Sequence, residues 1–276
     1  MTLKELYKYC SDKLSFGECG DFEALCIFND LLGISKGKIL LSEVQVTEEQ
    51  EKIVNDVIKK RLNGEPLQYI LGKWDFYDLT FSVGEGVLIP RPETEMLVDF
   101  ALEKLENIDN PVVYDLCAGT GCIGLTIAAH RKGATVYLLE KEDKAFAYLK
   151  NNKELLKLDN VVLIHGDLFN FDFSSLPNCD LLLSNPPYIN SNEIQALQKE
   201  VLKEPVTALD GGTDGLVFYR CIANRCVHKI NKNGFCAFEC GEQQSKDIIK
   251  IFQGKFSQKE VLFDFNNIDR IVTFRI

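Results

Sequence analysis

The stretch Val112-Val-Tyr-Asp-Leu-Cys-Ala-Gly-Thr-Gly-Cys-Ile-Gly124 decides the fold. It begins as a continuous apolar strand and continues as a turn whose glycines, Gly119, Gly121 and Gly124, satisfy the pattern G-x-G-x-x-G. A strand that leads through such a turn into a helix is typical of nucleotide-binding α/β sheets. Glu140 closes the next apolar run about 20 residues later, where an acid that binds a ribose is expected.

Strands and helices alternate from residue 111 onward. Short runs that are apolar on both faces predict buried parallel strands at 112–116, 135–139, 161–164, 181–183 and 235–238. Segments of helical length and period lie between them, at 122–131, 143–157 and 217–231. The tail predicts an antiparallel pair from 260–265 and 270–274. We expect an α/β fold with a doubly wound, mostly parallel, seven-stranded Rossmann-like sheet and an antiparallel C-terminal hairpin at its edge.

A small helical domain and a hairpin precede this sheet. Apolar residues at helical spacing, with a capping box from Thr47 to Gln50, predict helices across residues 1–73. Between 74 and 92 the period changes to two, which predicts a β-hairpin that turns at Gly84-Glu-Gly86 and returns at 87–89. We therefore expect three parts, a helical domain at 1–73, a β-hairpin linker at 74–92 and the α/β domain at 93–276.

Composition and charge exclude several classes of protein. Of the 276 residues, 46% are hydrophobic and 26% are charged, values close to globular averages, so neither disorder nor a disulfide-stapled miniprotein is expected. Lys and Arg total 31 against 41 Asp and Glu, for a net charge of −10. Because tight sequence-independent binding of nucleic acid normally needs a basic surface, nucleic acid is disfavoured as a direct partner.

The cysteines and histidines do not suggest a metal site. The ten cysteines include no Cys-x-x-Cys pair, and His130, His165 and His228 lie far apart, so we expect no bound metal. The first residues lack the apolar stretch of a signal peptide, and no run reaches membrane-spanning length. We expect a cytoplasmic protein with free thiols and no membrane partner.

Asp167 and Leu168 follow the third predicted strand of the sheet, where the adenine end of a nucleotide would lie. The Asp167 carboxylate can accept from an exocyclic amine, and Leu168 can offer an apolar wall. Taken alone, Asp167 is equally typical of a turn or a helix cap. The glycine turn and Glu140 do not separate a dinucleotide site from an S-adenosylmethionine site, because both place an adenosine across the same crevice.

The segment Ser184-Asn-Pro-Pro-Tyr188 follows the fourth predicted strand, at the edge where open α/β sheets place their chemistry. Pro186 and Pro187 remove two N–H donors and fix two φ angles, and the residue before a proline is held extended. Asn185 therefore has little backbone freedom. The loop is rich in acceptors, since the side-chain oxygen of Asn185 and the carbonyl of Pro186 can point at one spot.

Two fixed acceptors suit a primary amino group on a planar carbon, such as an amide or a nucleobase amine. The lone pair of that nitrogen is delocalised, so it attacks poorly. Hydrogen bonds from both of its N–H groups favour pyramidalisation and stabilise the positive charge that develops as it takes a methyl group. Tyr188 is expected to pack on the flat face of the substrate, and no strong base is needed because the proton can leave after transfer.

Together with the glycine turn, Asn185-Pro-Pro-Tyr188 resembles class I S-adenosylmethionine-dependent methyltransferases that act on planar amino groups. More widely, the chain resembles the HemK-type peptide chain release factor N5-glutamine methyltransferases over nearly its whole length. The segments that carry this second resemblance are Gly64-Glu-Pro-Leu-Gln-Tyr-Ile-Leu-Gly72, Leu88-Ile-Pro-Arg-Pro-Glu-Thr-Glu95, Glu204-Pro-Val-Thr-Ala-Leu209 and Gly241-Glu-Gln-Gln244.

The resemblance implies methylation of the glutamine in the Gly-Gly-Gln loop of peptide chain release factors, which act in translation termination, with S-adenosyl-L-methionine as cofactor. It implies that 1–73 recognises substrate and that 93–276 is catalytic. The expected cofactor contacts are Cys117, Ala118, Gly119, Thr120, Gly121, Glu140, Asp167, Leu168 and Asn185. The residues expected to hold glutamine are Asn185, Pro186, Pro187 and Tyr188. One departure is Cys117-Ala118, where many relatives have Gly and a small hydroxyl residue.

Other interpretations of the motifs remain. A nucleic-acid amino-methyltransferase acting on adenine N6 or guanine N2 would use the same loop, but the acidic charge and the lack of a basic recognition domain argue against it. An NAD-linked dehydrogenase would account for the turn and Glu140 but not for Asn185-Pro-Pro-Tyr188. A non-catalytic binding module would leave every reactive motif unused.

Overall fold

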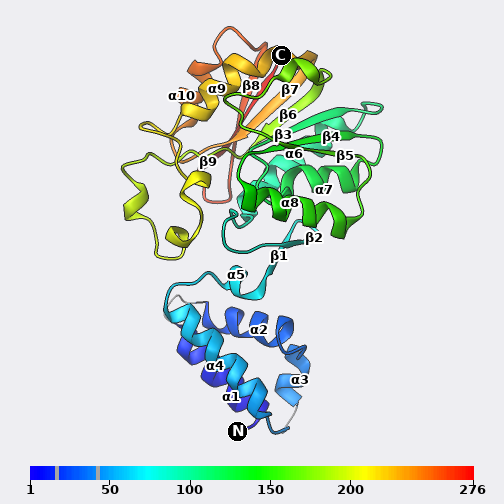
Figure 1. Ribbon diagram of the computed structural model, residues 1–276. Helices are drawn as coiled ribbons and strands as arrows, with labels where there is room; N and C mark the ends of the chain where they lie inside the picture. The colour runs from blue at the N-terminus through cyan, green and yellow to red at the C-terminus, as the bar shows by residue number, and fades with distance from the viewer. Residues whose placement is uncertain (16–18, 42–43) are drawn as a thin grey trace. The chain divides into compact units, whose positions relative to one another are not determined.

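The computed structural model describes residues 1–15, 19–41 and 44–276, which form two compact units. One unit consists of Met1–Lys73 and Gln198–Lys203, and the other of Trp74–Leu197 and Glu204–Ile276. Figure 1 colours the chain along its length. In the part of the chain that the structure describes, no helix combines the length and apolar character that a bilayer span requires.

The first unit is helical, and its helices are α1 (Leu3–Leu14), α2 (Gly20–Asp30), α3 (Lys36–Leu41), α4 (Glu48–Leu62) and α5 (Leu67–Leu71). Helix α1 packs against α2 and α4 through its buried face. The predicted capping box is confirmed at the start of α4. Oγ1 of Thr47 accepts the N–H of Gln50 at 3.2 Å, and Oε1 of Gln50 accepts the N–H of Thr47 at 3.0 Å.

A buried arginine ties the distant segment Gln198–Lys203 to these helices. The side chain of Arg61, on α4, is 3% exposed and pairs with Glu23 of α2 at 2.6 Å and with Glu200 at 3.0 Å. Nη1 of Arg61 also donates to the carbonyl of Glu65 at 2.5 Å. Removing either carboxylate would leave part of a buried charge unpaired, so this cluster is a fixed part of the helical unit.

The second unit is built on a seven-stranded sheet, which confirms the predicted fold class. Its strands are β3 (Val112–Leu116), β4 (Thr135–Glu140), β5 (Val161–His165), β6 (Cys179–Ser184), β7 (Ile230–Glu239), β8 (Gln258–Phe263) and β9 (Asp269–Arg275). Their order is β5-β4-β3-β6-β7-β9-β8, and only the pairs that involve β9 are antiparallel. The strand order reverses between β3 and β6, so a crevice forms at their carboxyl ends.

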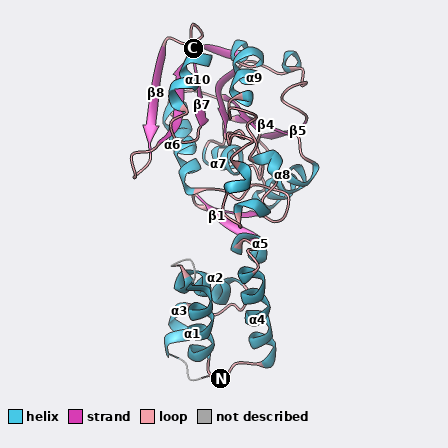
Figure 2. Cartoon of the chain, turned by 90° about the vertical axis from the view of Figure 1, so that its left-hand side faces the viewer, coloured by secondary structure: helices cyan, strands magenta, loops and turns pink. Residues whose placement is uncertain are grey.

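Helices cover both faces of this sheet (Figures 1 and 2). They are α6 (Glu95–Leu105), α7 (Cys122–His130), α8 (Asp143–Leu156), α9 (Val217–Arg225) and α10 (Ser245–Ile251). One core joins α6, α7 and α8 to residues such as Val113 and Leu181, and the other joins α9 and α10 to residues such as Tyr114 and Leu182. Neighbouring strand residues thus enter opposite cores, which explains why these strands are apolar on both faces.

The hairpin before the sheet differs from the prediction. Strands β1 (Lys73–Phe76) and β2 (Leu79–Ser82) turn at Tyr77 and Asp78, and residues 87–89 do not form a strand. Tyr77 adopts a left-handed φ of 60°, because its N–H donates to Glu95 at 2.7 Å and its hydroxyl donates to Asp99 at 2.8 Å. The N–H of Ile89 donates to a carboxylate instead of a strand partner.

Two further predictions were wrong, one about the end of a helix and one about the burial of a strand. The helix expected at 217–231 ends at Arg225, because Ile230 already pairs with Cys179 as the first residue of β7. The strand at 161–164 is not buried on both faces. It is the edge strand β5, and Val162 is 40% exposed on its open face.

Candidate active site

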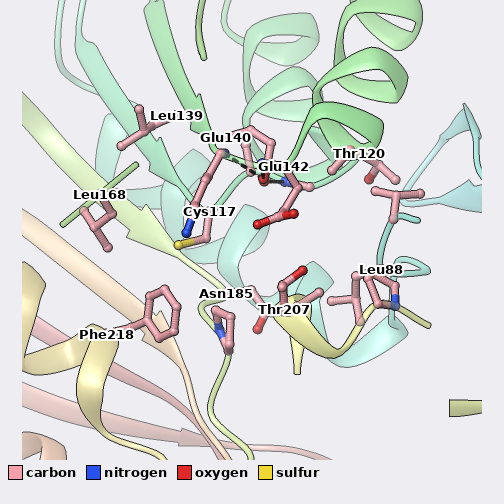
Figure 3. A pocket seen from close by; sticks show the side chains of 18 of the residues that line it. Leu88, Cys117, Thr120, Leu139, Glu140, Glu142, Leu168, Asn185, Thr207 and Phe218 are labelled. Atoms are coloured by element: carbon pink, nitrogen blue, oxygen red, sulfur yellow. Dashed lines mark hydrogen bonds between the residues drawn. The ribbon is translucent and has the colours of Figure 1, made fainter. Parts of the chain in front are cut away.

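A cavity of about 310 Å³ lies at the carboxyl ends of β3, β4 and β6. Figure 3 shows Leu139, Leu168 and Phe218 along one side of it, and Leu88 and Thr120 along the opposite side. Its volume lies at the small end of the range of small-molecule sites, and its position is the one at which open α/β sheets bind ligands.

The turn between β3 and α7 has left-handed backbone at three positions, Cys117 (φ 60°), Gly119 (φ 57°) and Gly121 (φ 82°). The N–H of Ala118 donates to the carbonyl of Leu139 at 3.0 Å, which anchors the turn to β4. Glycine adopts this backbone freely, whereas a side chain in the same conformation costs roughly 1–2 kcal/mol. Cys117, a residue with a side chain at such a position, therefore carries backbone strain.

Two glycines let α7 approach the neighbouring elements. A Cβ on Gly121 would lie 2.3 Å from Cδ1 of Leu149, and a Cβ on Gly124 would lie 2.8 Å from Cδ2 of Leu138. Both distances are far shorter than van der Waals contact, so either new side chain would force the leucine or the start of the helix to shift. These glycines hold the turn in place, and the cavity shape depends on them.

Most of the predicted cofactor contacts line the cavity. They are Cys117, Ala118, Gly119, Thr120, Glu140, Asp167, Leu168 and Asn185. In the predicted glutamine-binding loop, Asn185 and Pro187 line it. Gly121, Pro186 and Tyr188 are not among the lining residues. Tyr188 instead packs into the core on the α9 side, with its hydroxyl 3.4 Å from the carboxylate of Glu239.

The Glu140 carboxylate is fixed by backbone donors. Oε2 accepts the N–H of Gly119 at 2.8 Å, and Oε1 accepts the N–H groups of Lys141 at 2.7 Å and Glu142 at 2.8 Å. Burial raises the pKa of Glu140, and the three N–H donors act in the opposite direction. Oε1 has both lone pairs occupied, whereas Oε2 has one left for a ligand.

Asp115 is a second buried carboxylate, directly beneath the turn. Its Oδ2 accepts the N–H of Gly124 at 2.9 Å, and its Oδ1 has no hydrogen-bond partner among the residues that the structure describes. Burial raises the pKa of Asp115 to about 7, the Gly124 N–H lowers it, and the nearby Glu140 raises it. A buried carboxyl with one unpartnered oxygen is costly, and such groups concentrate at functional sites.

Asp167 and Leu168 lie beside the cavity in different roles. Leu168 is buried and forms part of its apolar wall. Asp167 uses Oδ1 to accept the N–H of Phe169 at 2.9 Å, which is the behaviour of a turn residue, and its Oδ2 lies 3.2 Å from Nζ of Lys141. The carboxylate still lines the cavity.

Two lining segments far apart in sequence are joined by Glu204. Its buried carboxylate accepts the N–H of Ile89 at 2.9 Å and forms an ion pair with Arg91. Most residues of 86–91 and of 205–210 line the cavity, so Glu204 holds two of its walls together. In the sequence, only the family resemblance connects these two segments. No local sequence pattern could predict their contact, because Arg91 and Glu204 lie 113 positions apart in the sequence.

Other lining residues were not predicted from the sequence, among them Thr94, Glu142, Thr207 and Phe218. Thr94 and Thr207 come from segments that the tertiary fold alone brings to the crevice, and Phe218 lies at the start of α9. A residue-by-residue motif search finds none of them. Among the described residues, no group of three or more His, Cys, Asp or Glu side chains is arranged to hold a metal ion.

Solved structures resemble this chain in fold. The catalytic domain of human Mettl16, in complex with an RNA hairpin, superposes with a TM-score of 0.56 at 14% identity, covering 83% of this chain and 80% of that one. The Thermus thermophilus 16S rRNA N2 G1207 methyltransferase, solved with AdoMet and guanosine, gives a TM-score of 0.52 at 17% identity, covering 74% and 49%. At these identities the likeness shows the fold alone.

The sequence itself matches two family profiles, the PrmC N-terminal domain over residues 5–72 and the methyltransferase small domain over residues 94–229. The release factor glutamine methyltransferase of Thermodesulfovibrio yellowstonii is 37% identical over 265 residues, covering 95% of this chain and 93% of the relative. The enzyme of the same name from Bacillus cereus is 34% identical, covering 99% and 98%. The chain therefore belongs to the family of release factor glutamine methyltransferases.

Proposed function

We propose that the cavity holds S-adenosylmethionine beside Asn185, and that the loop from Asn185 to Tyr188 presents a release-factor glutamine to the methyl group. Membership of the family makes the chain an S-adenosylmethionine-dependent glutamine methyltransferase. The proposal adds which residues carry out the reaction. The observation that supports it most strongly is that the Asn185 side chain lines the same cavity as the glycine turn and Glu140.

The residues of the cavity match the chemistry of this cofactor. A flat adenine suits the apolar side formed by Leu139, Leu168 and Phe218. The open lone pair on Oε2 of Glu140 suits one ribose hydroxyl, and Glu142, which lines the cavity next to it, is our candidate for the other. When bound, S-adenosylmethionine supplies an electrophilic methyl group on a sulfonium.

The substrate nitrogen is activated by acceptors rather than by a base. We assign one N–H of the glutamine amide to Oδ1 of Asn185 and the other to the carbonyl of Pro186. Two such bonds draw the nitrogen out of amide planarity and stabilise the positive charge that it gains on methylation. The surplus proton then leaves to water, so Asn185 and Pro186 serve as hydrogen-bond acceptors and take up no proton themselves.

The finer identity of the substrate is also part of the proposal. We assign the methylated residue to the glutamine of the Gly-Gly-Gln loop, and we assign docking of the release factor to the helical residues 1–73. That unit exposes apolar side chains such as Tyr9 and Leu62, which are 38% and 56% exposed. Because an amide nitrogen is a weak nucleophile, binding energy from the whole factor is needed to position it, and free glutamine should be a poor substrate.

The test is to incubate the purified chain with labelled S-adenosylmethionine and a purified release factor, and to locate the label by peptide mass spectrometry. We expect one methyl group on the glutamine of the Gly-Gly-Gln loop, and none when that glutamine is replaced by alanine. Duplex DNA and NAD are the controls. Label on DNA, heat of binding with NAD but not with S-adenosylmethionine, or label elsewhere in the factor would contradict the proposal.

A further inference from the structure

Thr94, Asn185 and Glu239 form a hydrogen-bonded chain that ends at the cavity. Thr94 closes the short helix η2 (Pro92–Thr94), Asn185 follows β6, and Glu239 ends β7. Oγ1 of Thr94 donates to Oε2 of Glu239 at 2.6 Å, and Nδ2 of Asn185 donates to Oγ1 of Thr94 at 3.2 Å. Thr94 and Glu239 are only 2% and 3% exposed, so water does not compete for these bonds.

The chain has a fixed direction while Glu239 is ionised. A carboxylate only accepts hydrogen bonds, so the single hydroxyl proton of Thr94 is committed to Glu239. What Thr94 offers to Asn185 is therefore a lone pair, and only the NH₂ group of the Asn185 amide can donate to it. The amide oxygen is left for the cavity, and among the described residues no group donates to it.

Thr94 does not serve the role that its position suggests. It stands at the N-cap of α6, where a threonine side chain normally accepts an N–H of the first turn. Its φ and ψ of −66° and −22° are helical, and its side chain makes no capping bond. Its hydroxyl instead donates a hydrogen bond to the carboxylate of Glu239, which lies 145 residues away in the sequence.

The other oxygen of Glu239 reaches the far end of the same loop. The hydroxyl of Tyr188 lies 3.4 Å from Oε1 of Glu239 and donates to it. The carbonyl of Tyr188 accepts Nε2 of Gln244 at 2.9 Å, which holds the tyrosine from its other side. One buried carboxylate thus connects both ends of Asn185-Pro-Pro-Tyr188, one directly and one through Thr94.

We propose that Thr94 and Glu239 are positioning residues that orient the Asn185 amide with its oxygen toward the substrate. A free asparagine can present either its oxygen or its nitrogen, and only the oxygen accepts from a glutamine NH₂. The hydroxyl–carboxylate pair removes that ambiguity before substrate binds, which is the condition for electrostatic preorganisation. This inference rests on the proposed function of Asn185.

The kinetic test compares Thr94→Val, which keeps the shape and removes the hydroxyl, with Thr94→Ser, which keeps the hydroxyl. We expect T94V to lower kcat about 10- to 100-fold, the order of loss that misplacement of a reacting group causes. Affinity for S-adenosylmethionine, measured by calorimetry, should fall far less than kcat. T94S should retain most of the wild-type kcat. A T94V enzyme with wild-type kcat, or a T94S enzyme as slow as T94V, would overturn the proposal.

A double-mutant cycle separates positioning from general damage. If Thr94 acts through Asn185, then T94V should have almost no further effect on kcat in the Asn185→Ala background. If the two losses multiply instead, Thr94 acts by another route and the inference is wrong. Thermal unfolding of each variant shows whether a lost activity comes from a lost fold.

A spectroscopic readout keeps this inference distinct from the proposed function. The side-chain NH₂ resonances of Asn185 report its hydrogen bond in the free protein, with no substrate or cofactor present. We expect them to shift in T94V and to stay near their wild-type position in T94S. If the wild-type chain methylates no release factor, the proposed function fails, whereas unshifted Asn185 resonances in T94V refute the positioning role itself.

Discussion

The carboxylate of Glu140 accepts the backbone N–H of Gly119 at 2.8 Å, and this bond joins the end of β4 to the glycine turn after β3. Two motifs that stand 21 residues apart in the sequence are thereby one structural unit. The same carboxylate also accepts the N–H groups of Lys141 and Glu142, just before α8, so its orientation is set before any ligand arrives.

Replacing Glu140 with Ala should weaken binding of S-adenosylmethionine about 10- to 100-fold, because a hydrogen bond to a charged group is worth about 1.5–3 kcal/mol. It should also lower the free energy of unfolding by about 1–3 kcal/mol, since N–H donors lose their acceptor. Calorimetric titration and urea unfolding measure the two effects. Glu103→Ala, at a side chain 68% exposed, is the control and should change neither. Wild-type affinity in E140A would contradict the role.

Alanine at Gly119 and at Gly121 should have different consequences. Both positions have positive φ, so each substitution should cost roughly 1–2 kcal/mol of backbone strain. At Gly121 the new Cβ would also lie 2.3 Å from Leu149, whereas at Gly119 the nearest atom is 4.0 Å away. We expect G121A to be the less stable variant by a further ~1–3 kcal/mol. G119A should fold but bind cofactor poorly, and equal urea midpoints would rule out the steric argument.

Sequence patterns predicted the strands of the sheet because burial of a strand determines the residue types within that same short segment. A strand such as β3 or β6 sends alternate side chains into two separate cores, so it is mostly apolar on both faces, the buried Asp115 of β3 being an exception, and the composition of each run shows this directly. The hairpin turn at Tyr77 was missed for the opposite reason. A tyrosine adopts a left-handed backbone there only because two carboxylates of α6 hold it, and those contacts are tertiary.

The residues of the candidate site likewise fall into two groups, those that the sequence predicted and those that it did not. Residues of the glycine turn and Asn185 were predicted because each follows its strand directly, and a parallel sheet gathers the carboxyl ends of its strands. Thr94, Glu204 and Glu239 could not be predicted from patterns. Their roles depend on partners more than 90 residues away, as the bonds of Thr94 to Asn185 and Glu239 show.

Asp115 should make stability fall as pH rises. Burial raises its pKa to about 7 in the folded protein, above its ordinary value of 3.8, so the folded state holds a proton that the unfolded state has lost between these pH values. Asp115→Asn removes this penalty and keeps an oxygen for the N–H of Gly124. The free energy of unfolding of D115N should exceed that of wild type by up to about 4 kcal/mol at pH 8 and by less at pH 5.

Urea unfolding of wild type and D115N at both pH values measures this difference. Asp109→Asn, at an exposed position, is the matched control and should show no such pH-dependent gain. A gain in D115N that is the same at pH 5 and pH 8 would mean that ionisation of Asp115 is not its cause.

Ionisation of Glu239 should make kcat for methyl transfer decrease at acidic pH, which would appear as an acid limb in the pH profile of kcat. Burial raises the pKa of Glu239 to about 7, with the bond from Thr94 acting in the opposite direction. Below that pH the carboxyl carries a proton that it can donate to Thr94, whose own hydroxyl is then free to turn toward the oxygen of Asn185. We expect kcat to fall as pH drops below about 7, and Glu239→Gln, which has no proton to gain, to lack this limb.

Assigning the acid limb to Glu239 requires that titration of the neighbouring groups does not cause it. The titratable and charged side chains that act on it or share its surroundings are Glu93, Cys122, Tyr188, Tyr219, Cys240 and Arg270. The tyrosines and cysteines have pKa values raised by burial, so they stay neutral across this range. D115N, which removes the other carboxyl whose pKa is raised to about 7, should keep the limb, and a pH profile unchanged in E239Q would refute its assignment to Glu239.

Asn185→Ala and Asn185→Asp should be comparably inactive, although the second keeps an acceptor oxygen. N185A loses a preorganised contact to the substrate, which should lower kcat about 10²- to 10³-fold while cofactor affinity stays close to wild type. In N185D a carboxylate replaces the NH₂ that donates to Thr94, so it faces a lone pair and lies near the buried Glu239 carboxylate. This repulsion is relieved only if the new carboxylate takes up a proton or if its side chain turns away from Thr94. Either change disturbs the oxygen that should accept the hydrogen bond from the substrate. Single-turnover methylation measures both variants, and a nearly active N185D would show that the Asn185 nitrogen, and with it the bond to Thr94, is dispensable.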